Sequence, residues 1–224
     1  MYIGKKFGKT EFSDSHKELD VLEYHRAYWN EELVKYMPYR PGLDVLVLGC
    51  DKGLLLDRLD GRSSSAWGIN QILPPESLAP EQTLLAEYER LPLDTDAFDA
   101  VFGHQILTSA FHVERTLQEL ARVLHPSGRL VLWESGRFLK SVDGGRLECH
   151  MQKAHLTSIV REPFDWIAYP LIALIGRVPW LATADLSQAI AKAAFAVDGQ
   201  LLKSAAFRDT SRHVIVVAEK EIPS

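Results

Sequence analysis

The fold is decided by one stretch of the chain, Asp44-Val45-Leu46-Val47-Leu48-Gly49-Cys50-Asp51-Lys52-Gly53, which four leucines follow within the next six residues. The first five residues, four of them apolar, predict a buried parallel strand. The glycines at both ends of the loop predict a turn that approaches a ligand closely, because glycine has no Cβ. The leucines predict a helix from about 52 to 59. A ligand site is therefore expected at the carboxyl edge of an open α/β sheet.

Strand-like and helix-like segments alternate along the rest of the chain, which favours βαβ units and a parallel sheet. Strands are expected at 65–69, 83–86, 98–102 and 129–133, and helices at 15–37, 113–124 and 183–197. A capping box at Ser15 and Glu18 would begin the first helix. Near the C-terminus, strands at 200–207 and 213–219 could pair as an antiparallel hairpin.

Composition describes an ordinary globular chain of 224 residues, 46% hydrophobic and 25% charged, with a net charge of −5. Its length suits a single domain. The acidic balance argues against nucleic-acid binding, which relies on basic contacts to phosphate. Two cysteines, Cys50 and Cys149, suit a reducing, cytoplasmic location. We see no secretory signal in the first ten residues and no apolar run of about eighteen residues, so no transmembrane segment is expected.

Three segments together resemble the class I S-adenosylmethionine-dependent methyltransferases of the small-molecule, quinone-biosynthesis-like (type 11) family. The first is the glycine loop that ends at Gly53. The second is Leu91-Pro92-Leu93 followed by Phe98-Asp99-Ala100-Val101, which is similar to the family's "LP…FD.V" block. The third is Leu120-Ala121-Arg122-Val123-Leu124-His125-Pro126-Ser127-Gly128-Arg129-Leu130, which is similar to "RvLkPGG.L". Their order and spacing make the resemblance specific over about residues 44–133.

The resemblance implies a Rossmann-like, seven-stranded methyltransferase sheet, mostly parallel with an antiparallel last strand, and helices on both faces. It implies S-adenosylmethionine as the cofactor, with Gly49 and Gly53 passing under its methionine and ribose parts. Asn70 stands where the family holds the ribose, and Glu87 and Tyr88 stand where it reads the adenine. The cofactor-binding residues implied in this chain are Gly49, Cys50, Asp51, Gly53, Asn70, Gln71, Glu87, Tyr88 and His104.

Three positions depart from the family pattern. Val47 stands where an acid commonly lies near the end of the first strand, and Asp51 replaces the middle glycine of the loop. Asn70 replaces the acid that holds the ribose hydroxyls, and an amide lacks the charge that strengthens such hydrogen bonds. If the ribose contact is family-like, Asn70→Asp is predicted to tighten cofactor binding. These changes are compatible with a weak binder, with shifted contacts or with a fold that has lost catalysis.

Candidate catalytic groups lie after the fourth and fifth strands. His104 is the candidate general base, because it follows the fourth strand at the edge where the methyl group should point; alternatively it lines the pocket or caps the next helix. Glu134 could bind a polar substrate group or cap a turn. The spacing of Cys149, His150 and His155 matches no zinc pattern, so no metal is predicted.

Two further regions bear on the substrate. Tyr24, His25, Tyr28 and Trp29 cluster on the predicted N-terminal helical segment (13–37), which would cover the ligand or pack on the sheet edge. A lid-like insertion is expected at about 136–182, and within it residues 163–181 are strongly apolar. That apolar segment could shape a pocket for an apolar or aromatic acceptor, form a dimer interface, rest on a membrane or bury itself as a satellite core.

The leading hypothesis is an S-adenosylmethionine-dependent methyltransferase that acts on a small molecule by direct displacement. The second is a non-catalytic methyltransferase-like protein that binds a partner or another ligand. A nicotinamide dehydrogenase is disfavoured, because the loop lacks the Gly-x-Gly-x-x-Gly spacing and no acid ends the second strand. A homodimer or a protein partner stays open.

Overall fold

The computed structural model describes residues 21–59, 63–72, 80–142, 146–178, 180, 185–208 and 210–222. Contacts between Cα atoms separate two compact units. The sheet unit comprises Leu33–Pro163 and Arg212–Ser224, and the helical unit comprises the residues up to Glu32 together with Phe164–Ser211. The single domain expected over 1–224 stays a prediction. The predicted capping box at Ser15 and Glu18 lies outside the described residues.

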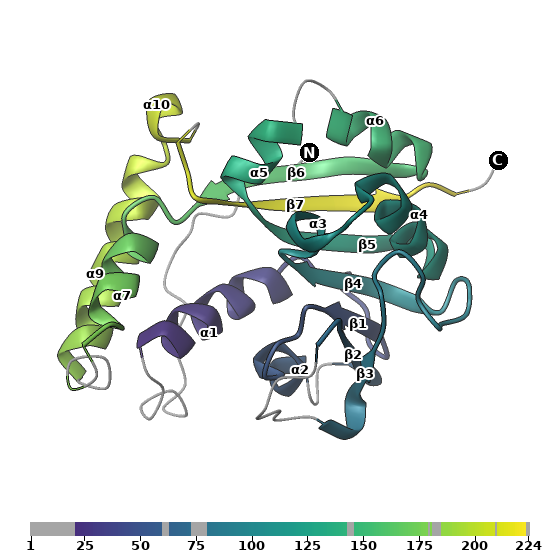
Figure 1. Ribbon diagram of the computed structural model, residues 1–224, viewed down its shortest axis with the longest axis horizontal. Coiled ribbons are helices and arrows are strands. Elements are labelled where there is room, and N and C mark those ends of the chain that lie inside the picture. The colour runs from purple at the N-terminus through teal and green to yellow at the C-terminus, as the bar shows by residue number, and fades with distance from the viewer. Residues whose placement is uncertain are drawn as a thin grey trace. The chain divides into compact units, whose positions relative to one another are not determined.

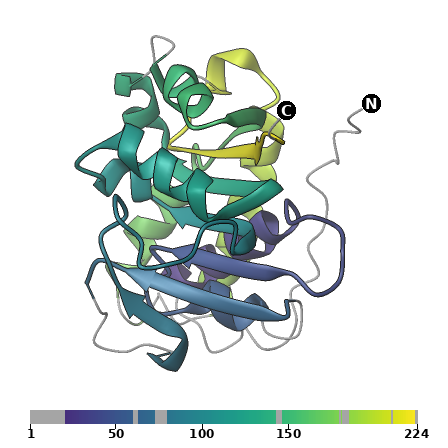
Figure 2. The ribbon, with the colours of Figure 1, turned by 90° about the vertical axis from the view of Figure 1, so that its right-hand side faces the viewer.

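The sheet unit is built on a seven-stranded sheet with the order β3-β2-β1-β4-β5-β7-β6, which can be followed from edge to edge in Figure 1 and from the side in Figure 2. β1 is parallel to β2 and to β4, β2 is parallel to β3, and β4 is parallel to β5, whereas β7 is antiparallel to β5. The predicted fold class is confirmed. The strands are β1 Asp44–Leu48, β2 Ser65–Asn70, β3 Thr83–Leu85, β4 Phe98–His104, β5 Leu124–Ser135, β6 Leu156–Phe164 and β7 His213–Lys220.

Strand alternation divides the buried side chains of this sheet between its two faces. Leu46, Leu48 and Val101 share one hydrophobic core with the apolar faces of α4 and α6. Their alternate neighbours on the other face, such as Val47 and Phe102, are also buried. Near-continuous apolar strands are the pattern of a sheet covered on both faces. The described helices of this unit are α2 Leu54–Leu59, η2 Pro80–Gln82, α3 Ile106–Ser109, α4 Val113–Val123, α5 Gly136–Val142 and α6 Arg146–Lys153.

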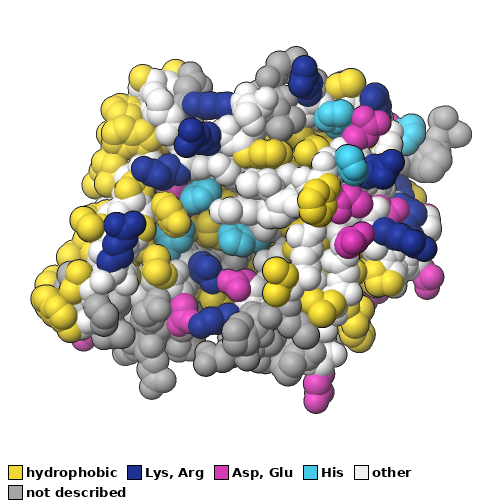
Figure 3. Space-filling model, viewed as in Figure 1, with side chains coloured by type: hydrophobic (Ala, Val, Ile, Leu, Met, Phe, Trp, Pro, Cys, Tyr) yellow, Lys and Arg dark blue, Asp and Glu magenta, His cyan; other side chains and the backbone are white. Residues whose placement is uncertain are grey.

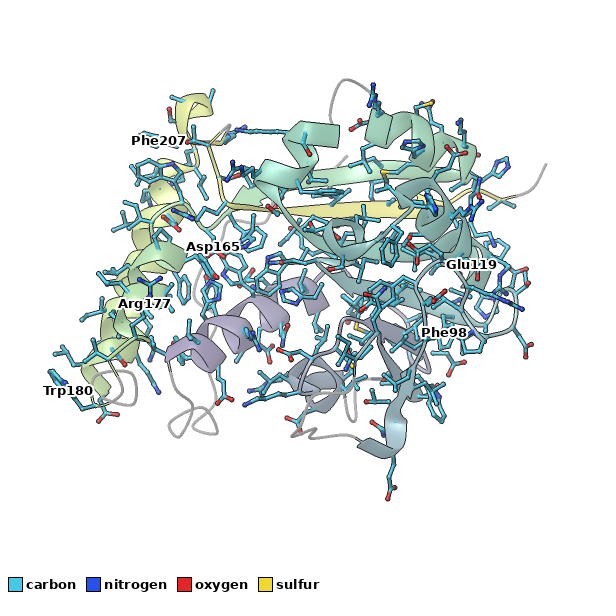
Figure 4. The ribbon with its side chains drawn as sticks, viewed as in Figure 1. Phe98, Glu119, Asp165, Arg177, Trp180 and Phe207 are labelled. Carbon is cyan, nitrogen blue, oxygen red and sulfur yellow. The ribbon has the colours of Figure 1, made fainter. Side chains whose placement is uncertain are left out.

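Arg122 joins two of the sequence motifs that suggested the family. Its guanidinium donates to the carbonyl oxygens of Leu91 and Leu93, and it forms hydrogen bonds with Glu119 on the same helix. The Glu119 carboxylate in turn accepts the backbone N–H of Leu91 at 3.0 Å. Figure 4 labels Glu119, which lies on α4 beside the segment that connects β3 to β4. Both motifs therefore fix the backbone between β3 and β4.

Asp99 also fixes backbone, at the amino edge of the sheet. One carboxylate oxygen accepts the backbone N–H of Asp44 at 2.9 Å, and the other pairs with Arg40. The carboxylate thus ties the start of β1 to the start of β4. Because the ligand edge of a parallel sheet is the carboxyl edge, this motif residue has a structural role.

The helical unit has a small core of its own. Its described helices are α1 Val21–Val34, α7 Ala168–Ile175, α9 Asp185–Leu201 and α10 Ala205–Arg208. Tyr24, Ile172 and Phe195 belong to the cluster buried among them. The Asp198 carboxylate accepts three backbone N–H groups at the start of α7, from residues 166–168. The apolar segment 163–181 thus contributes α7 to a satellite core.

Two predictions near the C-terminus were wrong. The strand expected at 200–207 is instead the end of α9 followed by α10, and the expected hairpin with 213–219 does not form. β7 lies between β5 and the edge strand β6, and β6 falls inside the stretch where a lid was expected. Residues 200–207 mix apolar residues with Gln200, Lys203 and Ser204, and periodicity cannot distinguish a strand from a helix over so short a segment.

Candidate functional site

The loop after β1 turns sharply through backbone conformations that favour glycine. Gly49 has φ 65° and Gly53 has φ 94°, and Asp51 between them has φ 49°. A Cβ on Gly49 would lie 2.7 Å from the backbone oxygen of His104. Glycine is therefore required at 49, both for its positive φ and because the end of β4 approaches so closely. The loop lies at the carboxyl ends of β1 and β4, as the sequence predicted.

Asn70, at the end of β2, is hydrogen-bonded to that loop. Its Oδ1 accepts the backbone N–H of Asp51 at 3.2 Å, and its Nδ2 donates to the backbone oxygen of Asp51 at 3.2 Å. The side chain is 5% exposed. Because an amide carries both a donor and an acceptor, the Asn70 side chain can bind the backbone N–H and the backbone oxygen of Asp51 together. This geometry gives asparagine at 70 a role in shaping the loop.

Cys50 turns its side chain into the protein interior. A Cβ on Gly68 would lie 2.7 Å from its Sγ, so the small residue in β2 makes room for the thiol. Burial raises the pKa of the Cys50 thiol. A neutral, buried thiol leaves only the Cys50 backbone to contact a ligand in the loop.

Tyr88 and Glu87 follow β3 and differ in exposure. Tyr88 is 5% exposed, and burial raises its pKa to about 12. Backbone groups of Gln71 and Gly49 oppose that rise, which places the phenol beside the glycine loop. Glu87 is exposed, so its carboxylate remains accessible to a ligand at this edge.

His104 ends β4 on the sheet face opposite the α4 core. Its ring meets the Trp133 ring in a T-shaped contact with centroids 4.3 Å apart, and Trp133 meets His213 at 5.7 Å. These three rings come from adjacent strands and form a row, which we call the aromatic row. Next to it, Gln105 has φ 51° and donates its backbone N–H to the Trp133 oxygen at 2.7 Å. Strained backbone of this kind is concentrated at functional sites.

Glu134 follows Trp133 in β5 and is fully buried. Its carboxylate accepts the backbone N–H groups of Leu107 and Thr108 and the Thr108 hydroxyl, at 2.8, 3.2 and 2.9 Å. Burial raises the pKa of Glu134 to about 7, and these hydrogen bonds oppose the rise. Of the two roles that the sequence left open, the structure shows the cap: Glu134 holds the start of α3, directly after His104 and Gln105.

The aromatic cluster of the N-terminal helix surrounds a buried carboxylate inside the helical unit. Asp165 accepts the indole N–H of Trp29 at 3.0 Å and lies 2.9 Å from His25 Nε2. Tyr28 stacks on Phe195 with centroids 4.0 Å apart. Figure 4 labels Asp165. Within the described residues, no group of three or more His, Cys, Asp or Glu side chains is arranged to hold a metal ion.

Comparison with known proteins agrees with this geometry. Residues 46–132 match the family described as Methyltransferase domain. This part of the chain is similar to methyltransferase domains. It runs from β1 to β5 and so includes the glycine loop, Asn70, Glu87 and His104. The chain is also 29% identical over 130 residues to the ubiquinone/menaquinone biosynthesis C-methyltransferase UbiE of Bordetella parapertussis, covering 52% of this chain and 49% of that protein. The chain thus spans about half the length of this curated relative.

Solved structures share the fold of this chain at lower identity. Geranyl diphosphate C-methyltransferase from Streptomyces coelicolor has a TM-score of 0.59 and 18% identity, covering 96% of this chain and 86% of that one. The [4+2]-cyclase SpnF has a TM-score of 0.62 and 18% identity, covering 88% and 81%. A putative methyltransferase of Haloferax volcanii, solved with the activator Trm112, has a TM-score of 0.60 and 15% identity, covering 91% and 94%. These likenesses concern the fold.

Sequence reasoning missed two members of the aromatic row. Trp133 and His213 carry no motif, and His213 lies about eighty positions beyond Trp133 in the chain. Strand alternation alone would have put Trp133 on the same face as Val131, but its contact with His213 depends on β7 pairing with β5.

Within the described residues, no helix is long and apolar enough to cross a bilayer.

Proposed function

We propose that the protein transfers a methyl group from S-adenosylmethionine to a small-molecule acceptor. The observation that carries this proposal is the glycine loop of the methyltransferase domain, whose Gly49 meets the end of β4 at His104. The left-handed backbone of this loop, the exposed Glu87 carboxylate and the His104 imidazole come at the carboxyl ends of β1, β3 and β4 respectively. This carboxyl edge is where open α/β sheets bind their ligands.

The residues at this edge fit the cofactor in most respects. Glu87 offers an exposed carboxylate that can accept hydrogen bonds from the adenine amino group. Gly49, Cys50, Asp51 and Gly53 offer backbone groups for the methionine and ribose parts, with Gln71 and Tyr88 beside them. Asn70 is the exception, because its amide is engaged by the Asp51 backbone. The cofactor, when bound, supplies an electrophilic methyl group on a sulfonium.

The chain's own contribution to the reaction would be positioning and proton removal. Positioning a nucleophile against an electrophile can supply roughly 7–11 kcal/mol. His104 would accept the acceptor's proton, and its contact with Trp133 limits the orientations of the imidazole. The cap that Glu134 forms on α3 fixes the backbone that follows His104. We propose an apolar or aromatic acceptor, because the partly exposed His104 ring is backed by the buried ring of Trp133.

Calorimetric titration with S-adenosylmethionine and S-adenosylhomocysteine tests the cofactor part of the proposal. We expect micromolar binding of both. Methyl transfer to a panel of phenolic and quinol acceptors tests the rest. His104→Ala is expected to lower turnover by about 10²–10⁴-fold and to leave cofactor affinity within a few fold. His125→Ala, at the other end of β5, is the matched control and should change neither quantity.

A second candidate function is a non-catalytic binding protein with the methyltransferase fold. The engagement of Asn70 by the loop favours it, because that amide is then not directed at a cofactor. One neighbour in fold was solved together with an activator protein, which is compatible with a protein partner. No binding of either ligand at millimolar concentration would overturn methyl transfer and favour this candidate.

A further inference from the structure

Helix α9 is apolar on two sides, and only one side is buried in the helical unit. Ala191, Ala194 and Phe195 face the small core with α1 and α7. The opposite side is exposed and carries no charge. It consists of Leu186, Ala189, Ala193, Ala196 and Val197, which recur at helical spacing and form what we call the outer stripe. An amphipathic surface helix normally presents charged or polar residues to water there.

Large apolar side chains extend this exposed surface beyond α9. Leu186 is 62% exposed and Val197 is 47% exposed. Leu174 of α7 is 61% exposed, and Trp180, just beyond α7, is 77% exposed. Figure 3 shows hydrophobic side chains gathered over α7 and α9, and Figure 4 shows Trp180 at the end of this helix pair. Single exposed apolar residues are ordinary, whereas a gathered set marks an interaction surface.

The charges around the outer stripe are predominantly positive. Among the described residues from 164 to 208, the exposed cations are Arg177, Lys192, Lys203 and Arg208. Of the carboxylates in the same span, Asp165 and Asp198 are buried and hydrogen-bonded, and only Asp185 is exposed. This local excess of positive charge contrasts with the net charge of −5 for the chain.

We propose that the outer stripe of α9, with Trp180 and its flanking cations, docks on the surface of an anionic lipid bilayer. Apolar side chains with Trp and Leu, bordered by Lys and Arg, are the composition of helices that lie in a membrane interface. A second copy of the chain fits less well, because a symmetric contact would bring two positively charged surfaces together. The proposal goes beyond methyl transfer and does not depend on it.

Vesicle co-sedimentation tests the proposal with the full-length protein. The two lipid preparations are phosphatidylcholine alone and phosphatidylcholine mixed with phosphatidylglycerol. We expect binding to the mixed vesicles, little binding to phosphatidylcholine alone, and weakening at high salt, because salt screens the cations. Arg177→Gln with Lys203→Gln should weaken binding by roughly tenfold or more, since each basic residue near the surface contributes about fivefold.

Leu186→Glu with Val197→Glu addresses the apolar part. Both positions are exposed and glutamate is a good helix former, so the fold should be retained, and circular dichroism checks this. We expect this variant to lose binding to the mixed vesicles. Tyr39→Glu is the matched control, because Tyr39 is exposed but lies in the sheet unit, and it should bind like the wild type.

Three outcomes would overturn the proposal. The wild type could fail to bind the mixed vesicles, or the folded Leu186→Glu/Val197→Glu variant could bind as well as the wild type. Sedimentation velocity without lipid could instead reveal a dimer that this variant dissociates, which would assign the outer stripe to a second copy of the chain.

Discussion

Asn70 and Asp51 are joined by two hydrogen bonds that run in opposite directions, one from the Asp51 backbone N–H to Oδ1 and one from Nδ2 to the Asp51 backbone oxygen, each at 3.2 Å. The side chain at the end of β2 thereby closes the ligand loop after β1. The same amide stands where the sequence resemblance suggested a contact with ribose. The two hydrogen bonds therefore explain why position 70 is an asparagine, which the sequence alone did not.

Asn70→Asp is expected to weaken the protein. A carboxylate keeps the acceptor for the Asp51 N–H but faces the Asp51 carbonyl without a donor, which should lower the unfolding free energy by about 1–3 kcal/mol. Urea denaturation measures this change. Because the loop loses a hydrogen bond, we also expect weaker binding of S-adenosylmethionine. Gln82→Glu makes the same amide-to-acid change at an exposed position and should be nearly neutral. Unchanged stability with tighter cofactor binding would restore the ribose contact.

Gly49→Ala is expected to be strongly destabilising. The new Cβ would lie 2.7 Å from the backbone oxygen of His104, and alanine disfavours φ 65°. We expect a loss of at least about 2 kcal/mol, together with loss of cofactor binding. Gly199→Ala in α9 is the matched control, because a Cβ there meets nothing within 4 Å. That change should stabilise the protein by about 0.5–1 kcal/mol. Equal melting temperatures for the two variants would contradict the expectation.

Stability should fall as pH rises through the titration of Glu134. Burial raises its pKa to about 7 in the folded protein, from an ordinary value of 4.5. Between these values the folded chain keeps a proton that the unfolded chain has lost, so the stabilising contribution is complete below the lower value and is lost as pH approaches the upper one. The contribution is on the order of 3 kcal/mol.

Glu134→Gln isolates this effect because glutamine does not titrate. Relative to the wild type, the variant should gain unfolding free energy as pH rises from 5 to 8 in a series of urea denaturations, by on the order of 3 kcal/mol. Parallel curves for the two proteins would show that Glu134 does not titrate in this range.

Arg122→Lys is expected to loosen the backbone between β3 and β4. Lysine cannot hold both carbonyl oxygens and the Glu119 carboxylate in the planar arrangement that the guanidinium provides. We expect a loss of about 1.5–3 kcal/mol. The Leu91 backbone N–H donates a hydrogen bond to Glu119, and its hydrogen exchange should accelerate. Arg115→Lys on the exposed side of α4 is the control, and a similar loss there would remove the argument.

Much of the sheet unit could be predicted from local sequence. The apolar run of β1, the glycine loop and the single apolar face of α4 are short-range patterns, and each was found within a few residues of its observed position. The placement of His104 at the end of β4 followed for the same reason. β6 was missed because its residues do not alternate cleanly and include Arg161, Glu162 and Pro163, which edge strands tolerate.

The sequence by itself determined the order of strands and helices from β1 to β5, because hydrophobic periodicity and turn glycines act over a few neighbouring residues. Only the tertiary structure decided which groups meet. Asn70 is hydrogen-bonded to the Asp51 backbone, and Glu134 to the backbone at the start of α3. His213 contacts Trp133, which in turn contacts His104, in the aromatic row. Each of these contacts joins residues that are distant in the chain, and strand pairing and burial bring them together. The residue pattern of a single segment does not predict such long-range contacts.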